Sequence, residues 1–370
     1  MRILGIESSC DETAAAIVED GTLLLSNVVK TQIDIHKIYG GVVPEIAARS
    51  HIEVINPVIE QALTDAKLSW DDIDGIAVTH APGLSGSLLV GTLAARTLAL
   101  LKSKPLFPIH HVEAHVYANF ITKQANGLAL SLPSRQPKFP MLALIVSGGH
   151  SQLVLFKNHG DYELLGQTQD DAVGEAFDKV AKIIGLPYPG GPSIAEAALH
   201  GNAKKYVLPK AKLQGAYDFS FSGLKTAVLR AVQHEVGVDT TFPSFKLPEL
   251  LNDTQRSDFA ASFQQTAIET LVDKAEAAFK DHSPASVVIA GGVAANQELR
   301  RQLQERLPLN IEYAPMQLCT DNAAMIATLG YYYAQKVAAN SPFTLEIQPS
   351  LSMTKTSWAH LDISPISSKS

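Results

Sequence analysis

The chain has 370 residues, 46% of them hydrophobic, and this length predicts two globular lobes, each with its own core. The formal net charge of -7 argues against a dedicated nucleic-acid-binding module, although local Lys and Arg clusters or a partner protein could still contact RNA. Cys10 and Cys319 are too far apart for a disulfide framework or a zinc ribbon. With neither a signal peptide nor a membrane-spanning run, we expect a cytoplasmic protein that does not associate with membranes.

The first third of the chain alternates between strand and helix patterns. Apolar runs predict strands at Arg2 to Glu7, Ala14 to Val18, Thr22 to Val29, Ile73 to Thr79 and Pro105 to Ile109. Helical periodicity predicts helices at Pro44 to Ala66 and Gly86 to Lys102. This order of elements predicts an α/β lobe.

The segment after the fifth predicted strand has the residues of a metal site. His111 and His115 are four residues apart, so in a helix they share one face, with Cβ atoms about 6 Å apart. Asp321 would supply an anionic third ligand, and this set suits Fe(II) or Zn(II) with positions left open for substrate oxygen. Because the chain has 12 His, such a pair also arises by chance. Its place at a strand end favours a site, since ligands in open α/β sheets bind there.

A polar, Pro-rich stretch from Gln124 to Pro140 predicts the lobe boundary. After it the first pattern repeats, with strands at Met141 to Val146, Ser151 to Phe156 and Tyr162 to Gln167 and a helix from about Gly174. The first of these strands ends in the turn Ser147-Gly148-Gly149-His150. Such a turn exposes backbone N–H groups that can bind a phosphate, although an ordinary hairpin has the same composition.

Another glycine turn follows the apolar strand Val287 to Ala290. Gly291 and Gly292 end this strand, and a periodic helix follows from Gln297 to Leu307. The free N–H groups and the positive dipole end of that helix would face a phosphate. Asn296 either caps the helix or contacts the ligand, and the two roles can coexist.

The duplicated strand-strand-strand-helix plan resembles the actin, hexokinase and Hsp70 (ASKHA) superfamily, an α/β fold with a repeated βββαβα core and a nucleotide cleft between two lobes. We expect residues 1–130 to form the first lobe, with a helix at about 322–340 packing back on it. Residues 138–320 would form the second, nucleotide-binding lobe, and residues 341–370 a tail. Within the second lobe, Val238 to Gln255 is a Pro-rich, polar insertion that predicts a surface loop.

Longer motifs occur in order along residues 1 to 340. They are Gly5 to Thr13, Gly40 to Glu45, His111 to His115, Val146 to His150, Asp170 to Lys179, Tyr188 to Pro192, Phe219 to Lys225 and Cys319 to Asn322. Together they resemble the bacterial tRNA N6-adenosine threonylcarbamoyltransferases of the Kae1/TsaD family.

The resemblance implies that a threonylcarbamoyl group passes from threonylcarbamoyl-AMP to N6 of the adenosine 3′ of the anticodon, in tRNAs that read ANN codons, with release of AMP. It implies one divalent metal per subunit, Fe(II) first and Zn(II) as the alternative, with His111, His115 and Asp321 as ligands. It places the adenylate contacts on Ile145, Val146, Ser147, Gly148, Gly149, Asp178, Gly191 and Asn296. Ala195 stands where some relatives have an acidic residue at the nucleoside, which leaves Asp178 as the main ribose anchor.

Further residues are candidates for proton transfer and tRNA contact. Glu12 and His150 are candidate proton acceptors, with a purely structural role as the alternative for each. Lys225, Arg49 and Lys37 are candidates for phosphate contact, although solvated lysines are commoner than binding ones.

The resemblance also implies protein partners, namely a shorter paralogue of the same fold (TsaB-type) and a small P-loop ATPase (TsaE-type). The predicted helix at Pro44 to Ala66 and the helix with His111 and His115 are candidate docking faces, and an ordinary core is the alternative explanation of their apolar residues.

Other functions compatible with these patterns are a kinase or ATPase, a protease and a scaffold. A sugar kinase or ATPase of the same fold would use the glycine turns on ATP, but has no use for His111 and His115. A metalloprotease would use the histidine pair on zinc, yet the chain lacks the His-Glu-x-x-His helix. A non-catalytic scaffold would not need an intact set of ligands.

Overall fold

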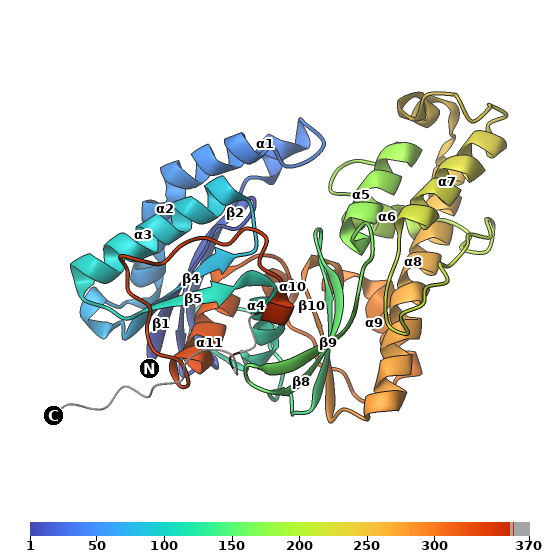
Figure 1. Cartoon of the computed structure of the whole chain (residues 1–370). Helices are drawn as coiled ribbons and strands as arrows, with labels where there is room; N and C mark the ends of the chain where they lie inside the picture. Colours follow the sequence, from blue (N-terminus) through green and yellow to red (C-terminus); the bar gives the residue numbers. More distant parts are fainter. Residues whose placement is uncertain (356–357, 359–370) are drawn as a thin grey trace. The chain divides into compact units, whose positions relative to one another are not determined.

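The computed structural model describes residues 1–355 and 358, in two compact units (Figure 1). The first unit comprises residues 1–141 and 156–163 and the described part of 312–370, and the second comprises residues 142–155 and 164–311. The tail predicted at 341–370 therefore lies partly outside the described residues. Among the residues described, no helix has both the length and the apolar character needed to cross a bilayer.

A six-stranded sheet forms the centre of the first unit, in the order β5-β4-β1-β2-β3-β6. Its strands are β1 (Arg2–Glu7), β2 (Glu12–Glu19), β3 (Leu23–Thr31), β4 (Gly75–Ala81), β5 (Leu106–His110) and β6 (Lys123–Gln124). β1, β2 and β3 form an antiparallel meander, whereas β1, β4 and β5 run parallel. The carboxyl ends of the three parallel strands therefore meet at one edge, where side chains that follow them come together. The strands predicted here are confirmed, with ends that differ by at most two residues.

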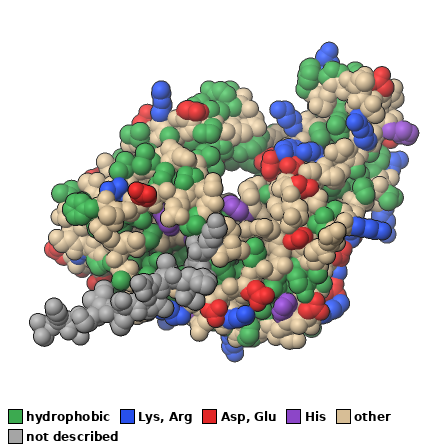
Figure 2. Space-filling view, in the orientation of Figure 1, with side chains coloured by type: hydrophobic (Ala, Val, Ile, Leu, Met, Phe, Trp, Pro, Cys, Tyr) green, Lys and Arg blue, Asp and Glu red, His purple; other side chains and the backbone are tan. Residues whose placement is uncertain are grey.

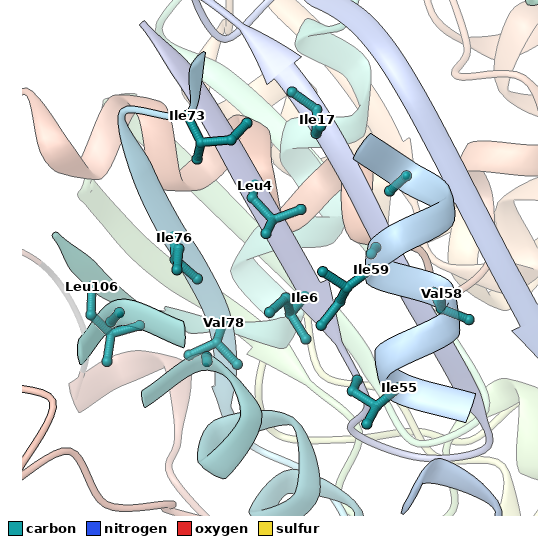
Figure 3. Packing of buried hydrophobic residues seen from close by; sticks show 14 of the residues in the cluster. Leu4, Ile6, Ile17, Ile55, Val58, Ile59, Ile73, Ile76, Val78 and Leu106 are labelled. Carbon is teal, nitrogen blue, oxygen red and sulfur yellow. The ribbon is translucent and has the colours of Figure 1, made fainter. Parts of the chain in front are cut away.

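Helices cover both faces of this sheet. They are α2 (Pro44–Ala66), α3 (Ser85–Lys102), α4 (His111–Tyr117) and α11 (Ala323–Ala334). The unit also contains the short helices α1 (Ile33–Lys37) and α10 (Met316–Cys319). On the face covered by α2 and α3, Leu4 and Ile6 of β1 pack in one cluster with Ile59 of α2 (Figure 3). Gly5 faces the opposite side, where a Cβ would lie 2.3 Å from the carbonyl oxygen of Ala323 in α11. The two-residue period of β1 therefore determines which helix each of its residues contacts.

The second unit repeats this plan around a four-stranded sheet in the order β10-β7-β8-β9. Its strands are β7 (Met141–Val146), β8 (Ser151–Asn158), β9 (Asp161–Gln167) and β10 (Ser286–Ala290). Its helices are α5 (Val173–Ile184), α6 (Gly190–Ala198), α7 (Ser222–Glu235), α8 (Asp253–His282) and α9 (Gln297–Arg306). β10 lies beside β7 as β4 lies beside β1, so the strand order shows the same duplication that the sequence predicts.

The predicted surface loop at Val238 to Gln255 is wrong in part. It contains a 3-10 helix, Ser244–Leu250, and Leu247 is buried against the second unit because that helix packs on α5. The segment also supplies the N-terminal cap of α8, since the Asn252 side chain accepts the Gln255 N–H at 2.9 Å. The prolines of this segment suggested an irregular loop, whereas its two buried leucines, Leu247 and Leu251, pack it against the unit.

Candidate metal centre and nucleotide turns

β5 and α4 position the two predicted histidine ligands. β5 ends at His110, whose ring nitrogen Nδ1 accepts the Glu113 N–H at 3.4 Å and caps α4. His111 and His115 then lie one turn apart on α4, with their Nε2 atoms 3.2 Å apart. Every residue of α4 is buried, so the prediction that this helix offers a docking face is wrong.

Asp321 reaches the same place from the turn between α10 and α11. Its Oδ1 atom lies 3.5 Å from Nε2 of His111 and 3.3 Å from Nε2 of His115. The next residue, Asn322, holds this turn: its side-chain N–H groups donate to the carbonyls of Leu318 and Thr320, at 3.2 and 2.8 Å. Asn322 also caps α11, so the start of that helix fixes the position of Asp321.

Opposite charges in this cluster shift its pKa values. Burial lowers the pKa of His111, but the carboxylates of Asp321 and Glu7 outweigh burial and raise that pKa well above its ordinary value. Burial disfavours the ionised form of Asp321, but His111 outweighs it and holds the pKa of this carboxyl well below its usual range. Burial lowers the pKa of His115. Asp321 is thus ionised and His115 neutral, as a cation requires, and cation binding would displace the proton that His111 holds.

The donor set fits a first-row divalent cation. One ligand atom each from His111, His115 and Asp321 lies within 4.8 Å of the others. Two imidazole nitrogens and a carboxylate oxygen are typical of Fe(II) and Zn(II) sites that keep coordination positions open. The structure therefore brings together the three predicted ligands, although two of them lie about two hundred residues from the third.

The turn after β7 presents glycines to open space. The Ser147 N–H donates to the His150 carbonyl at 2.8 Å, and the His150 N–H donates to the Ser147 hydroxyl at 3.1 Å, which closes the turn. Gly148 and Gly149 are exposed, and a Cβ on either would meet no atom within 4 Å beyond its chain neighbours. Ile145 and Val146 are fully buried, so neither presents its side chain to a ligand.

Asp178 of α5 holds the start of α6 with one of its two oxygens. Its Oδ1 atom accepts the Gly190 N–H at 2.7 Å, and no described residue hydrogen-bonds the other oxygen. Burial raises the pKa of this carboxyl. The adjacent Lys179 pairs with Asp171 and Glu175 instead, at 3.0 and 2.7 Å. The alternative role for Asp178, an ion pair with Lys179 or Lys182 on a solvated helix, is therefore not found among the described residues.

Gly190 and Gly191, at the start of α6, differ in their surroundings. A Cβ on Gly190 would lie 2.5 Å from the Cα atom of Asp178, whereas a Cβ on Gly191 would meet nothing within 4 Å. Gly190 is therefore required for packing. Nothing in the described fold explains Gly191, which is the glycine the sequence assigns to the nucleoside.

The turn after β10 lies against the end of β7. Gly291 has a φ of 90°, and a Cβ there would lie 2.5 Å from the Val146 carbonyl oxygen, so this close approach requires glycine. Asn296 caps α9, because its Oδ1 atom accepts the Leu299 N–H at 3.0 Å. Its side-chain nitrogen donates to Gln264 at 2.9 Å. The capping role predicted for Asn296 is confirmed.

Comparison with known proteins gives one family. Residues 23–328 match the family model described as "TsaD: tRNA N6-adenosine threonylcarbamoyltransferase". A protein of that name from Thermomicrobium roseum is 50% identical over 343 residues, which cover 91% of this chain and 93% of the relative. Another, from Dehalococcoides mccartyi strain CBDB1, is 46% identical over 354 residues, which cover 96% of this chain and 100% of the relative. The chain belongs to the TsaD family.

Membership of the TsaD family makes the chain a tRNA-modifying transferase, and neither a sugar kinase nor a metalloprotease is favoured. Among solved structures, HypF from T. kodakarensis matches with a TM-score of 0.57 and 14% identity, covering 90% of this chain and 48% of that chain. This likeness concerns the fold alone. The predicted α/β fold with a duplicated arrangement of strands is confirmed.

Glu12, one of the two proton acceptors predicted for this TsaD-family chain, is the first residue of β2. It accepts a hydrogen bond from the Thr31 hydroxyl at 3.3 Å. Burial, followed by the neighbouring Asp321 and Asp11, raises the pKa of Glu12 to about 10. Burial and these two carboxylates therefore disfavour the ionised form of Glu12. His150 lies in the glycine turn after β7 and is half-buried.

The residues predicted to contact tRNA phosphates differ in their charge environment. Lys225 forms an ion pair with Asp171 at 3.0 Å, so a phosphate would have to compete with a carboxylate. Lys37 and Arg49 are exposed on the first unit. On the face drawn in Figure 2, Lys and Arg side chains of the second unit lie beside Asp and Glu side chains, in agreement with the acidic total charge.

Sequence reasoning assigned no role to Glu7, although its carboxylate lies 3.0 Å from Nδ1 of His111. The available signal was a carboxylate directly after the apolar run Ile3 to Ile6, where a buried charge needs a partner.

Proposed function

We propose that this TsaD-family chain transfers a threonylcarbamoyl group from threonylcarbamoyl-AMP to N6 of the adenosine 3′ of the anticodon, in tRNAs that read ANN codons. A bond forms between N6 and the carbamoyl carbon, the bond from that carbon to the phosphate oxygen breaks, AMP leaves, and N6 loses a proton. The observation that supports this proposal is the convergence of His111, His115 and Asp321 in a chain of this family.

For the metal, we infer one Fe(II) per chain, with Zn(II) as the alternative, held by these three side chains. When bound, the cation supplies a Lewis acid that polarises an oxygen of the donor. The protein contributes the arrangement: the helical spacing in α4 sets the two imidazoles, and the capped start of α11 sets the carboxylate. Three protein ligands leave room for the substrate oxygen.

The second unit would bind the adenylate. Backbone N–H groups of the open turn at Ser147, Gly148 and Gly149 suit the phosphate, because no side chain obstructs them. The unengaged oxygen of Asp178 can accept a hydrogen bond from a ribose hydroxyl, and the open space at Gly191 allows the nucleoside to approach the backbone.

Three further residues are predicted to contact the adenylate. Ile145 and Val146 would do so through backbone groups, and Asn296 through the N–H of its amide that is not bonded to Gln264. Ile145 and Val146 are buried and would contribute backbone groups only. Asn296 uses one N–H of its amide on Gln264, so the second N–H is available for the nucleotide.

An exocyclic adenine amine is a poor nucleophile, so the activated donor and its orientation provide most of the acceleration. The two predicted proton acceptors are Glu12, whose ionised form is disfavoured by burial and by the neighbouring carboxylates, and His150 in the glycine turn. A strong base is not required, since N6 becomes acidic only as the new bond forms.

The proposed protein partners are a TsaB-type paralogue and a TsaE-type ATPase. The surface of α2 and α3 is the candidate docking face for the paralogue, because Ile52, Leu89 and Leu93 are 65%, 46% and 47% exposed. We place the protein in the cytoplasm, where its two free cysteines would stay reduced.

The test is a reconstituted reaction with unmodified tRNA, threonylcarbamoyl-AMP and both partner proteins, with the modified nucleoside measured by mass spectrometry. His111→Ala and Asp178→Ala should each abolish or strongly reduce the product. His200→Ala and Asp253→Ala remove the same residue types from exposed positions outside the site and should retain activity. Full product from both site variants would refute both site assignments.

A further inference from the structure

A buried carboxylate, that of Glu7, contacts the proposed metal ligand His111. Glu7, the last residue of β1, is fully buried, and its Oε2 atom lies 3.0 Å from Nδ1 of His111. Two donors hold this carboxylate in place: the Ser9 N–H reaches Oε1 at 2.5 Å, and the Thr79 hydroxyl reaches Oε2 at 2.5 Å. Strands β1, β4 and β5 run parallel, so Glu7, Thr79 and His111 meet at the same edge of the sheet.

This arrangement determines which ring nitrogen of His111 carries the hydrogen and which has a lone pair for a cation. Both oxygens of Glu7 already accept hydrogen bonds, so toward His111 the carboxylate acts as an acceptor and Nδ1 carries the hydrogen. The lone pair of the neutral ring then lies on Nε2, the atom 3.5 Å from Asp321 and 3.2 Å from Nε2 of His115.

The imidazole of His115, the second histidine ligand, is not oriented by a described side chain at its Nδ1 atom. Nδ1 of His115 is buried and has no hydrogen-bond partner among the described residues. Within residues 1–355 and 358, a side chain orients the imidazole of His111 at Nδ1 and none orients that of His115 at the same atom. The effect of Glu7 can therefore be measured without a parallel contribution at His115.

We propose that Glu7 is a positioning residue, which holds His111 as the Nδ1–H tautomer with Nε2 directed at the cation. The inference rests on the metal site of the proposed function. Carboxylates that accept from ligating histidines fix the ring and increase its basicity, and their loss typically costs about 10- to 100-fold in metal affinity.

The competing arrangement involves Ser9, whose hydroxyl lies 3.2 Å from the same Nδ1 atom. A hydroxyl that donated to Nδ1 would favour the tautomer with hydrogen on Nε2, which cannot bind a metal through that atom. The Glu7 carboxylate is closer to Nδ1 and cannot donate, so it determines the tautomer, and Ser9 at most shares the hydrogen.

The test uses Co(II) on the full-length, metal-free protein, read by its visible spectrum and by competition with a chelator. Glu7→Gln should weaken Co(II) binding by about 10- to 100-fold. Glu113→Gln is the matched control, a buried glutamate on the ligand helix whose Oε1 atom has no partner among the described residues, and should bind within about twofold of wild type. Ser9→Ala should also stay close to wild type.

The outcomes distinguish failure of the metal site from failure of the role proposed for Glu7. Co(II) binding that is lost in His111→Ala but unchanged in Glu7→Gln would leave the metal site standing and overturn the role of Glu7. Loss in Ser9→Ala with none in Glu7→Gln would overturn it in favour of the hydroxyl. A wild-type protein that binds no Co(II) would overturn the metal site and this inference together.

Thr79→Val serves if Glu7→Gln does not fold, as judged by circular dichroism of the metal-free protein. It keeps the carboxylate and removes the hydroxyl that orients it, so a severalfold weaker Co(II) affinity is expected. An unchanged affinity in Thr79→Val would then count against the proposal.

Discussion

Substituting Gly191 by alanine separates ligand binding from folding. Gly191 is the second residue of α6, and a Cβ there would meet no atom within 4 Å beyond its chain neighbours. Alanine therefore causes no clash within the described fold. Because alanine restricts the unfolded chain and favours helix, we expect the free energy of unfolding to rise by about 0.4–1 kcal/mol.

The same methyl group would occupy the space that we assign to the nucleoside. Forcing an extra methyl into a packed contact costs about 1–3 kcal/mol, which corresponds to about 5- to 150-fold in affinity. Gly191→Ala should therefore raise the KM for threonylcarbamoyl-AMP by a factor in this range, measured in the reconstituted reaction, while urea denaturation shows a protein at least as stable as wild type.

Gly190→Ala is the matched control one residue earlier. Its Cβ would lie 2.5 Å from the Cα atom of Asp178 and 2.6 Å from the Phe177 carbonyl oxygen, so it should lower the free energy of unfolding by about 1–3 kcal/mol. A Gly191→Ala protein with unchanged KM would refute the nucleoside assignment. Equal destabilisation by the two substitutions would refute the packing argument.

Three further predictions concern stability. Gly5→Ala should lower the free energy of unfolding by about 1–3 kcal/mol, because its Cβ would lie 2.3 Å from the Ala323 carbonyl oxygen; an unchanged thermal midpoint would contradict the close contact of β1 with α11. Asn322→Ala removes the cap of α11 and two bonds to backbone carbonyls, and should cost about 1–3 kcal/mol in thermal denaturation, whereas a loss of only a few tenths would mean that water replaces the side chain. Burial and, to a smaller extent, the positive charge of Lys336 lower the pKa of His159 to about 4. An exposed histidine has a pKa of about 6.5. The unfolded chain therefore binds this proton first, and the free energy of unfolding should fall by about 1–2 kcal/mol, discounted for solvent exposure, as the pH drops from about 6.5 to 4. Urea denaturation at both pH values should show a smaller fall in His159→Phe, and equal falls in the two proteins would exclude His159 as the cause.

Local patterns were sufficient for every strand except the two-residue β6, and for the histidine pair. The bounds predicted for β1, β7 and α2 agree with the structure residue by residue, because apolar periodicity and proline at a helix start depend only on neighbouring residues. The spacing of His111 and His115 is equally local, since one helical turn brings i and i+4 together.

The longest helix, α8, was missed for a physical reason. Its 30 residues bury Phe259, Phe263 and Ile268 among many polar residues, and it contacts α5, α6, α7 and α9. A helix packed on several sides lacks a single apolar stripe, so the pattern of period 3.6 that reveals a surface helix is weak there.

The amino-acid sequence by itself determined the strands, the ligand helix and, through its resemblance to a family, the identity of the three ligands. Only the tertiary structure decided that Asp321 reaches the two histidines, because this depends on α11 packing over Gly5. The same is true of Glu7, Thr79 and His111, which meet only because three parallel strands end at one edge of the sheet. Contacts between residues far apart in the chain follow from how whole elements pack, and no local pattern encodes that packing.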